Sequence, residues 1–224
     1  MNATLSERIE QVEHRIQTAV QRAGRSRDQI TLVAVTKKFF PTVICEAYAC
    51  GLRVFGENYV QEFAEKRPAL SGLSDAQFHL IGHLQSNKAR QAAELFHTVE
   101  TVDSEKLARR LNEIGRPLEV MIEVKVSPEG TKAGAAPDEL PGLIEGIRAC
   151  LNLRLTGLMT MPPWHPDPET TRPFFRRLAE LGRIHQLPKL SMGMSHDFEA
   201  AIEEGSTHIR VGSALFGLRP KAQS

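Results

Sequence analysis

One pattern repeats along the whole chain, a short apolar run followed by an amphipathic stretch of helical spacing. The first run, residues 30–35, is β-branched, apolar on both faces and too short for a helix, as strands of parallel sheets are. Strands that alternate with helices form a parallel sheet, and eight such units close a barrel. The sequence therefore predicts an α/β fold, a (β/α)8 barrel of the TIM type, with an open doubly wound sheet as the alternative. The predicted strands are residues 30–35, 52–55, 78–80, 97–102, 118–126, 153–160, 189–192 and 208–211.

Helices are predicted between these strands and also before the first one. Residues 5–23 place apolar side chains at helical spacing, and Gly24 follows as a stop signal. We expect this extra N-terminal helix to pack on the outside of the barrel or to cap one end. No break in the alternation suggests a second domain, so residues 1–224 are predicted to form one barrel domain. The other predicted helices are residues 43–50, 60–67, 88–93, 104–114, 140–150, 170–184 and 198–204.

Composition excludes several classes of protein. The 28 basic and 27 acidic residues cancel to a net charge of +1. The chain therefore lacks the excess of basic residues that is typical of proteins that bind nucleic acid or anionic membranes. No stretch approaches the roughly 20 apolar residues that span a bilayer, and the polar N-terminus does not resemble a signal peptide. Three cysteines without a Cys-x-x-Cys pair suggest neither a disulfide framework nor a zinc site. We expect a cytoplasmic monomer.

The ends of the predicted strands carry the residues that suggest chemistry. A barrel builds its active site where strands end and the following loops begin. Lys37 follows the first strand, and burial there would favour its neutral amine, a nucleophile that forms imines. Taken alone, such a lysine more often extends into solvent.

Glycine and serine residues follow the seventh and eighth strands, where barrels commonly hold phosphate. Ser195 follows the seventh strand, and Gly212 and Ser213 follow the eighth. Glycine lets backbone N–H groups approach an anion, and hydroxyls near helix N-termini add donors. Turns of this composition also occur without a ligand.

Arg210 lies inside the apolar eighth strand, where a permanent charge must find a partner. The partner is either a buried carboxylate or a ligand. Facing a pyridine nitrogen, the guanidinium would keep that nitrogen unprotonated and weaken the ring as an electron sink.

Other strand-end residues are weaker candidates. Met159 ends the sixth strand, and His83 follows Gly82 after the third, where polar packing is the alternative role. Asn58 after the second strand could bind a ring substituent or could cap the next helix. His79 and His83 project from a strand about 13 Å apart, too far to share a metal ion, so no metal site is expected.

These residues lie in stretches that resemble the pyridoxal phosphate homeostasis protein family, single barrels similar to the N-terminal domain of alanine racemase. The resemblance covers nearly the whole chain. The matching stretches are residues 32–37, 55–62, 79–88, 157–161, 191–195 with Asp197, and 205–212.

The resemblance implies that Lys37 carries pyridoxal 5′-phosphate as a Schiff base, that Arg210 faces the ring nitrogen, and that Ser195 with the Gly212–Ser213 backbone holds the phosphate. It also implies a role in vitamin B6 homeostasis, as a carrier that buffers the cofactor or delivers it to apo-enzymes, with no assigned catalytic reaction. Asn58, His83 and Met159 complete the expected cofactor-binding set.

Two departures from the family pattern leave questions open. The lysine segment reads Lys37-Lys38-Phe39-Phe40-Pro41, so Lys38 competes as the imine site, and Lys125 replaces a usual asparagine. Adjacent strand residues point to opposite faces, so only one of the two lysines can face the cavity. We assign Lys37, because it follows the matched Ala-Val-Thr stretch.

Alternative functions remain at this point. A racemase of the alanine racemase type needs a base on each face of its substrate, and only Tyr48 and Tyr59 supply a phenol. An aldolase-like barrel would also use a Schiff-base lysine and phosphate loops. A non-catalytic scaffold is the remaining possibility.

Overall fold

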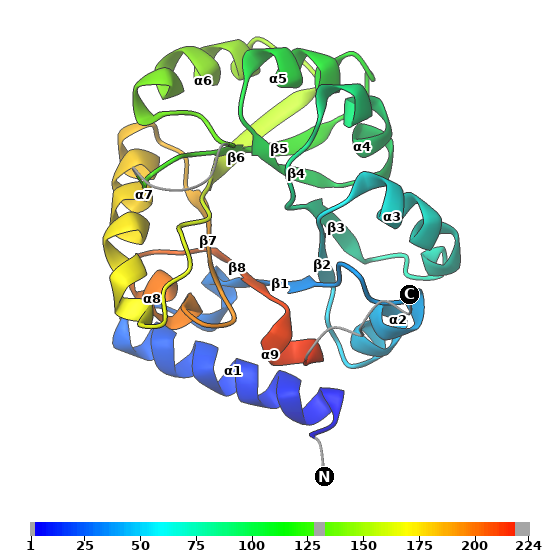
Figure 1. Ribbon diagram of the computed structural model, residues 1–224, viewed down its shortest axis with the longest axis vertical. Helices are drawn as coiled ribbons and strands as arrows, with labels where there is room; N and C mark the ends of the chain where they lie inside the picture. The colour runs from blue at the N-terminus through cyan, green and yellow to red at the C-terminus, as the bar shows by residue number, and fades with distance from the viewer. Residues whose placement is uncertain (1–2, 128–132, 218–224) are drawn as a thin grey trace.

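Eight parallel strands close into a barrel in chain order (Figure 1). The computed structural model describes residues 3–127 and 133–217. The (β/α)8 prediction is confirmed and the open-sheet alternative is wrong, because β1 pairs with both β2 and β8. The strands are β1 (Thr31–Val35), β2 (Val54–Glu57), β3 (Gln77–Leu80), β4 (Thr98–Val102), β5 (Leu118–Glu123), β6 (Leu153–Met159), β7 (Lys189–Met194) and β8 (His208–Val211).

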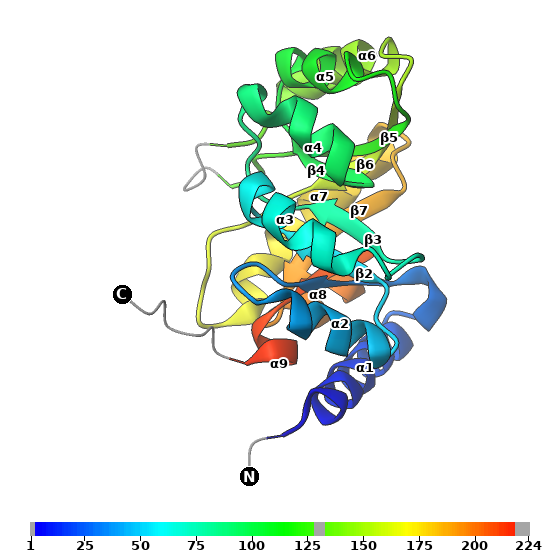
Figure 2. The same ribbon diagram turned by 90° about the vertical axis from the view of Figure 1, so that its right-hand side faces the viewer.

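Helices surround this ring, as Figures 1 and 2 show from two directions. Across the described residues, none of them is long and apolar enough to cross a membrane. The α-helices are α1 (Leu5–Arg22), α2 (Pro41–Ala49), α3 (Val60–Lys66), α4 (Ala89–Leu95), α5 (Glu105–Asn112), α6 (Leu140–Arg148), α7 (Arg172–Ile184), α8 (Phe198–Glu203) and α9 (Ser213–Phe216).

The predicted elements differ from the observed ones mainly at their ends. Helix α2 begins at Pro41, two residues earlier than expected, because proline fits the first helical position. The predicted fifth strand, 118–126, ends as a strand at Glu123 and continues only as a bridge from Val124 to Ala135. Helix α9 was not predicted, since four residues are too few to show a helical period.

The extra helix α1 lies outside the barrel, along α8 and α9 (Figure 1). Thr4 and Glu7 form a capping box at its start, with each side chain bonded to the other residue's backbone. One face of the helix is buried, and it carries Leu5, Ile9, Val12, Ile16, Ala19 and Val20. Burial of this apolar face fixes α1 against the last two βα units.

The molecule has two different interiors. An apolar core fills the space between the strands and the helices, and includes Phe55, Phe63 and Phe175. Inside the ring of strands, by contrast, charged and polar side chains are buried. They include His79, Glu100, Ser191 and Arg210. A buried polar interior of this kind needs internal hydrogen bonds, which the site described next contains.

Candidate functional site

A cavity of about 630 Å³ opens beside the carboxyl ends of the strands. This is the end of a parallel barrel at which loops assemble active sites. Residues from several loops meet there, far apart in the sequence. The described residues that line the cavity are Val35, Lys37, Phe39, Asn58, Ile81, Met161, Trp164, Met194, Ser195, His196, Asp197, Arg210, Gly212, Ser213 and Gly217.

Two adjacent lysines follow β1, and they have different surroundings. Lys37 is half-buried and lines the cavity. Lys38 is exposed and lies outside that lining, with its backbone at a φ of 65°. Its N–H donates to the Glu62 carboxylate at 2.5 Å, which holds the turn in this conformation. The geometry therefore favours Lys37 over Lys38 as the nucleophile of this cavity.

The loops after β7 and β8 meet at the hydroxyl of Ser195. Its Oγ accepts the backbone N–H of Gly212 at 3.1 Å and that of Ala214 at 3.3 Å. Gly193, just before this loop, has a φ of 91°, and a Cβ there would lie 2.5 Å from the Cβ of Ala201. Only glycine allows this close packing of β7 against α8. The result is a cluster of small polar groups on the cavity wall.

Helix α1 supports this cluster from outside the barrel. Arg15 donates to the backbone carbonyl of Ser195 at 3.1 Å and forms a bidentate pair with Glu199 at 2.6 and 2.9 Å. The Arg15 guanidinium also lies 4.3 Å from the centre of the Phe198 ring. Arg8 donates to the carbonyl of Leu215, in the short helix α9 that follows β8. The N-terminal helix thus positions both loops.

Arg210 projects from β8 into the barrel and lines the floor of the cavity, with 3% of its surface exposed. It donates to Ser191 Oγ at 2.6 Å and to the carbonyl of Thr160 at 2.8 Å. Ser191 Oγ in turn donates to Glu100 at 2.5 Å, and the other oxygen of Glu100 lies 2.7 Å from His79 Nδ1. A continuous hydrogen-bonded chain thus runs from Arg210 to His79.

Charges inside the barrel compensate one another. Burial alone would raise the pKa of Glu100, but the hydrogen bond with His79 and the nearby Arg210 charge lower that pKa to about 2. Burial lowers the pKa of Arg210, while Glu100, Glu123 and Asp197 counteract that effect. The Glu100 carboxyl therefore stays ionised at neutral pH, and a guanidinium such as that of Arg210 keeps its charge in proteins. The carboxylate expected as the partner of Arg210 is reached through Ser191.

The remaining predicted residues fall into two groups. Asn58 lines the cavity, and its buried Oδ1 has no hydrogen-bond partner. The competing capping role is wrong, because α3 has Tyr59 at its N-cap. His83 and Met159 are not among the lining residues. The His83 side chain is 56% exposed beside Asp103, and Met159 is fully buried one layer below Met161.

Some residues of the site had not been expected from sequence. Trp164 and His196 line the cavity with their rings 5.8 Å apart, and His196 Nε2 lies 2.8 Å from the carbonyl of Pro166. They come from loops, where no periodic pattern marks them. Glu100 could have been found, because it is a charged residue within an apolar strand, the same signal that singled out Arg210.

Comparison with known proteins assigns this chain to a family. Residues 8–220 match the family described as alanine racemase, N-terminal domain. Pyridoxal phosphate homeostasis proteins from Aquifex aeolicus and Pseudomonas aeruginosa are 44% and 45% identical. These alignments cover 98% and 97% of this chain and 99% and 96% of the relatives.

A solved structure with a similar fold supports the same family assignment. PipY of Synechococcus elongatus PCC7942, solved with PLP bound, has a TM-score of 0.81 and 37% identity. The alignment covers 96% of this chain and all of that one. This chain therefore belongs to the pyridoxal phosphate homeostasis protein family, within the alanine racemase N-terminal domain superfamily of barrels.

Proposed function

We propose that this chain binds pyridoxal 5′-phosphate as a Schiff base on Lys37 and serves vitamin B6 homeostasis by buffering or delivering the cofactor. The single observation that carries the proposal is the meeting of Lys37, Arg210 and the Ser195 cluster on one cavity. In the binding step, the Lys37 amine condenses with the cofactor aldehyde and water leaves. Held in this way, the cofactor would supply an electrophilic carbon conjugated to an electron-accepting ring.

The residues present fit the three polar parts of this cofactor. Ser195 Oγ and the N–H groups that converge on it, those of Gly212 and Ala214, offer donors for a phosphate group. Arg210 offers a donor to the pyridine nitrogen from the cavity floor. The unpartnered Oδ1 of Asn58 is a buried acceptor that a ring hydroxyl can satisfy.

Two observations favour a carrier over a catalyst. The guanidinium of Arg210 keeps its positive charge and would donate to the ring nitrogen, so that nitrogen would stay unprotonated and the ring would be a weaker electron sink. Both tyrosines of the chain lie outside the cavity lining, and Tyr48 is instead bonded to Asp75. A racemase would need a second acid–base group at the cofactor. Saturable racemisation of alanine or another amino acid by the purified protein would contradict the carrier role.

The attachment site can be tested with the two neighbouring lysines. Protein saturated with pyridoxal 5′-phosphate is reduced with borohydride, digested and mapped by mass spectrometry. We expect the adduct on Lys37, with imine absorbance lost in Lys37→Ala and kept in Lys38→Ala. Lys38→Ala is a matched control, because it removes an equal charge one residue away and outside the cavity. Imine absorbance retained in Lys37→Ala, with the adduct on Lys38, would overturn the assignment.

Cofactor delivery needs its own measurement. Loaded protein is mixed with an apo-enzyme that requires pyridoxal 5′-phosphate, and the rate of enzyme activation is compared with the separately measured rate at which the loaded protein releases cofactor to solution. A carrier that delivers gives activation faster than its own release of cofactor to solution. Activation limited to the rate of free release would support buffering and exclude direct delivery to that enzyme.

A further inference from the structure

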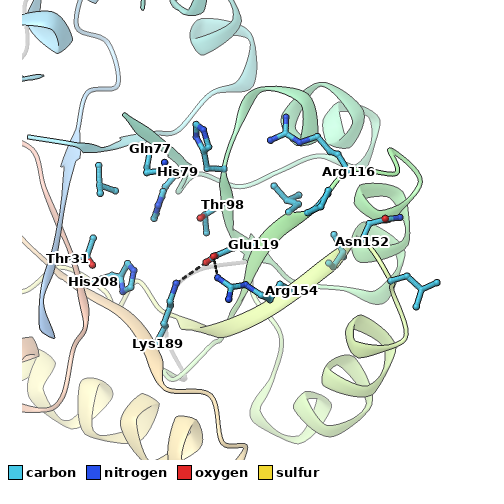
Figure 3. A pocket seen from close by; sticks show the side chains of 16 residues that line it. Thr31, Gln77, His79, Thr98, Arg116, Glu119, Asn152, Arg154, Lys189 and His208 are labelled. Carbon is cyan, nitrogen blue, oxygen red and sulfur yellow. Dashed lines mark hydrogen bonds and ion pairs between the residues drawn. The ribbon is translucent and has the colours of Figure 1, made fainter. Parts of the chain in front are cut away.

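A second cavity, of about 530 Å³, lies at the opposite end of the barrel (Figure 3). The first residue of every strand from β1 to β8 lines it, from Thr31 to His208. It is therefore the N-terminal mouth of the barrel, separated from the cofactor cavity by the length of the strands. None of the residues proposed to hold pyridoxal 5′-phosphate is part of its lining.

Cations outnumber anions in this cavity. Of the described residues that line it, three carry a permanent positive charge, Arg116, Arg154 and Lys189, and one carries a carboxylate, Glu119. Glu119 lies between two of them, bonded to Arg154 and to Lys189, the latter at 2.8 Å (Figure 3). One carboxylate cannot neutralise two cations, so a positive charge remains at the mouth.

Two of the three histidines that line the cavity, His97 and His208, add no positive charge to this balance. Burial lowers the pKa of His208 to about 4 and also lowers the pKa of His97, so both rings are neutral at pH 7. The Nδ1 atom of His97 accepts the N–H of Phe78 at 2.9 Å. The proton of that ring is therefore on Nε2, which makes it a further donor.

Structural roles account for only part of the charge. Arg116 donates to the carbonyls of Glu94 and Phe96, and so satisfies the end of α4. Within the described part of the chain, the side chains of Arg154 and Lys189 hydrogen-bond only to Glu119, so neither has a comparable structural role. The Lys189 side chain is 37% exposed, within reach of a ligand that enters from solvent.

From this surplus of donors and positive charge, we propose that the N-terminal mouth binds a small oxyanion, a phosphate or a carboxylate group, on Lys189 and Arg154. An ammonium and a guanidinium that share one carboxylate keep donors available for a second anion. Glu119 competes with that anion, and it therefore sets the affinity of the site. Because Glu119 lies beside both cations, replacing it with a neutral residue is expected to strengthen binding of the anion.

The test is a nuclear magnetic resonance titration of the cofactor-loaded protein, with inorganic phosphate in one arm and malonate in the other. Imidazole signals of His97 and His208 report on the N-terminal mouth, whereas amide signals of Ser195 and Gly212 report on the cofactor cavity. Sodium chloride at equal ionic strength controls for screening. We expect saturable shifts at the histidines with at least one probe, and the tighter probe identifies the group that the site prefers.

Three variants are expected to change the affinity for the anion in three different ways. Glu119→Gln should tighten binding about tenfold, because it removes a negative charge a few ångströms from the anion. Lys189→Met combined with Arg154→Met should abolish saturation. Arg90→Gln removes an exposed cation outside the cavity and should leave the affinity unchanged. Urea unfolding of each variant verifies that it is folded.

Two results would overturn the proposal. One is the lack of saturation at the histidines below about 50 mM of either probe, since weaker association gives less than about 2 kcal/mol. The other is a failure of Glu119→Gln to tighten binding in a folded protein. Neither result affects the assignment of Lys37, because the reporters of the cofactor cavity are read separately.

Discussion

Buried charged residues lie beneath the proposed cofactor cavity, and Glu100 is at the centre of their hydrogen-bonded chain. It is fully buried, ionised, and connected to Arg210 through Ser191. Removing one member of a buried charged set costs more than its direct hydrogen bond, because it leaves the opposite charge unpaired. The Arg210 side chain therefore depends on a residue it does not touch.

Glu100→Gln should lower the free energy of unfolding by about 3 kcal/mol, because Arg210 then lacks its main anion. Ser191→Ala should cost about 1–3 kcal/mol, since both charges remain while the two hydrogen bonds of the Ser191 hydroxyl, to Glu100 and from Arg210, are lost. The exposed Ser71→Ala is the control and should change little. Urea unfolding monitored by circular dichroism measures all three. Equal stability of Glu100→Gln and the control would show that the network does not stabilise the barrel interior.

At the scale of elements, helix α1 supports the loops after β7 and β8, which we propose to bind the cofactor phosphate. Eight βα units suffice to close a barrel, so an additional helix is free to serve another purpose. Here it joins the loops after β7 and β8 through Arg15 and Arg8. A precise site needs supporting residues that hold its first layer in place.

Arg15→Gln should weaken the binding of pyridoxal 5′-phosphate by about three- to tenfold, because the Ser195 loop loses its outer support. Its effect on stability should stay near 1 kcal/mol or less, since the pair with Glu199 is partly exposed. Arg22→Gln, on the same helix with a 67% exposed side chain, should leave cofactor affinity unchanged. Absorbance titration measures both variants. Equal cofactor affinities of Arg15→Gln and Arg22→Gln would show that α1 does not support the cofactor site.

At the scale of the whole molecule, the polar interior makes the barrel sensitive to acid. His208 stacks near His79, with ring centres 6.2 Å apart, and burial lowers the pKa of His208 from 6.5 to about 4. Between these values the unfolded chain binds a proton that the folded chain does not. Stability is therefore lost as the pH falls from 6.5 towards 4, and Glu100 extends the loss from pH 4.5 towards 2.

The free energy of unfolding should fall by about 3 kcal/mol between pH 7 and 4 through His208 alone, at roughly 1.4 kcal/mol per pKa unit. His208→Gln should flatten the pH dependence in that interval. The exposed His14→Gln should keep the slope of the original protein. Urea unfolding at a series of pH values provides the measurement. An unchanged slope in His208→Gln would place the acid sensitivity elsewhere.

Local sequence patterns were enough to predict the eight strands, most of the helices and the closed barrel. Apolar periodicity follows directly from which faces of an element are buried, and residues 208–211 were predicted with the same bounds as β8. The positions of Lys37, Ser195 and Gly212 followed as well, because the end of a parallel strand in a barrel always faces the same mouth.

Other features depended on contacts between residues distant in sequence. The separation of Lys37 from Lys38 by a positive-φ turn, the reach of Arg15 to Ser195 and the path from Arg210 to His79 join different strands and helices. The positively charged N-terminal mouth around Glu119 also depends on contacts between residues distant in sequence. By itself, the sequence determined which residues lie at each end of each strand, since that is a matter of local spacing. Only the tertiary structure decided which of them touch, because closing the ring brings together side chains that no local pattern relates.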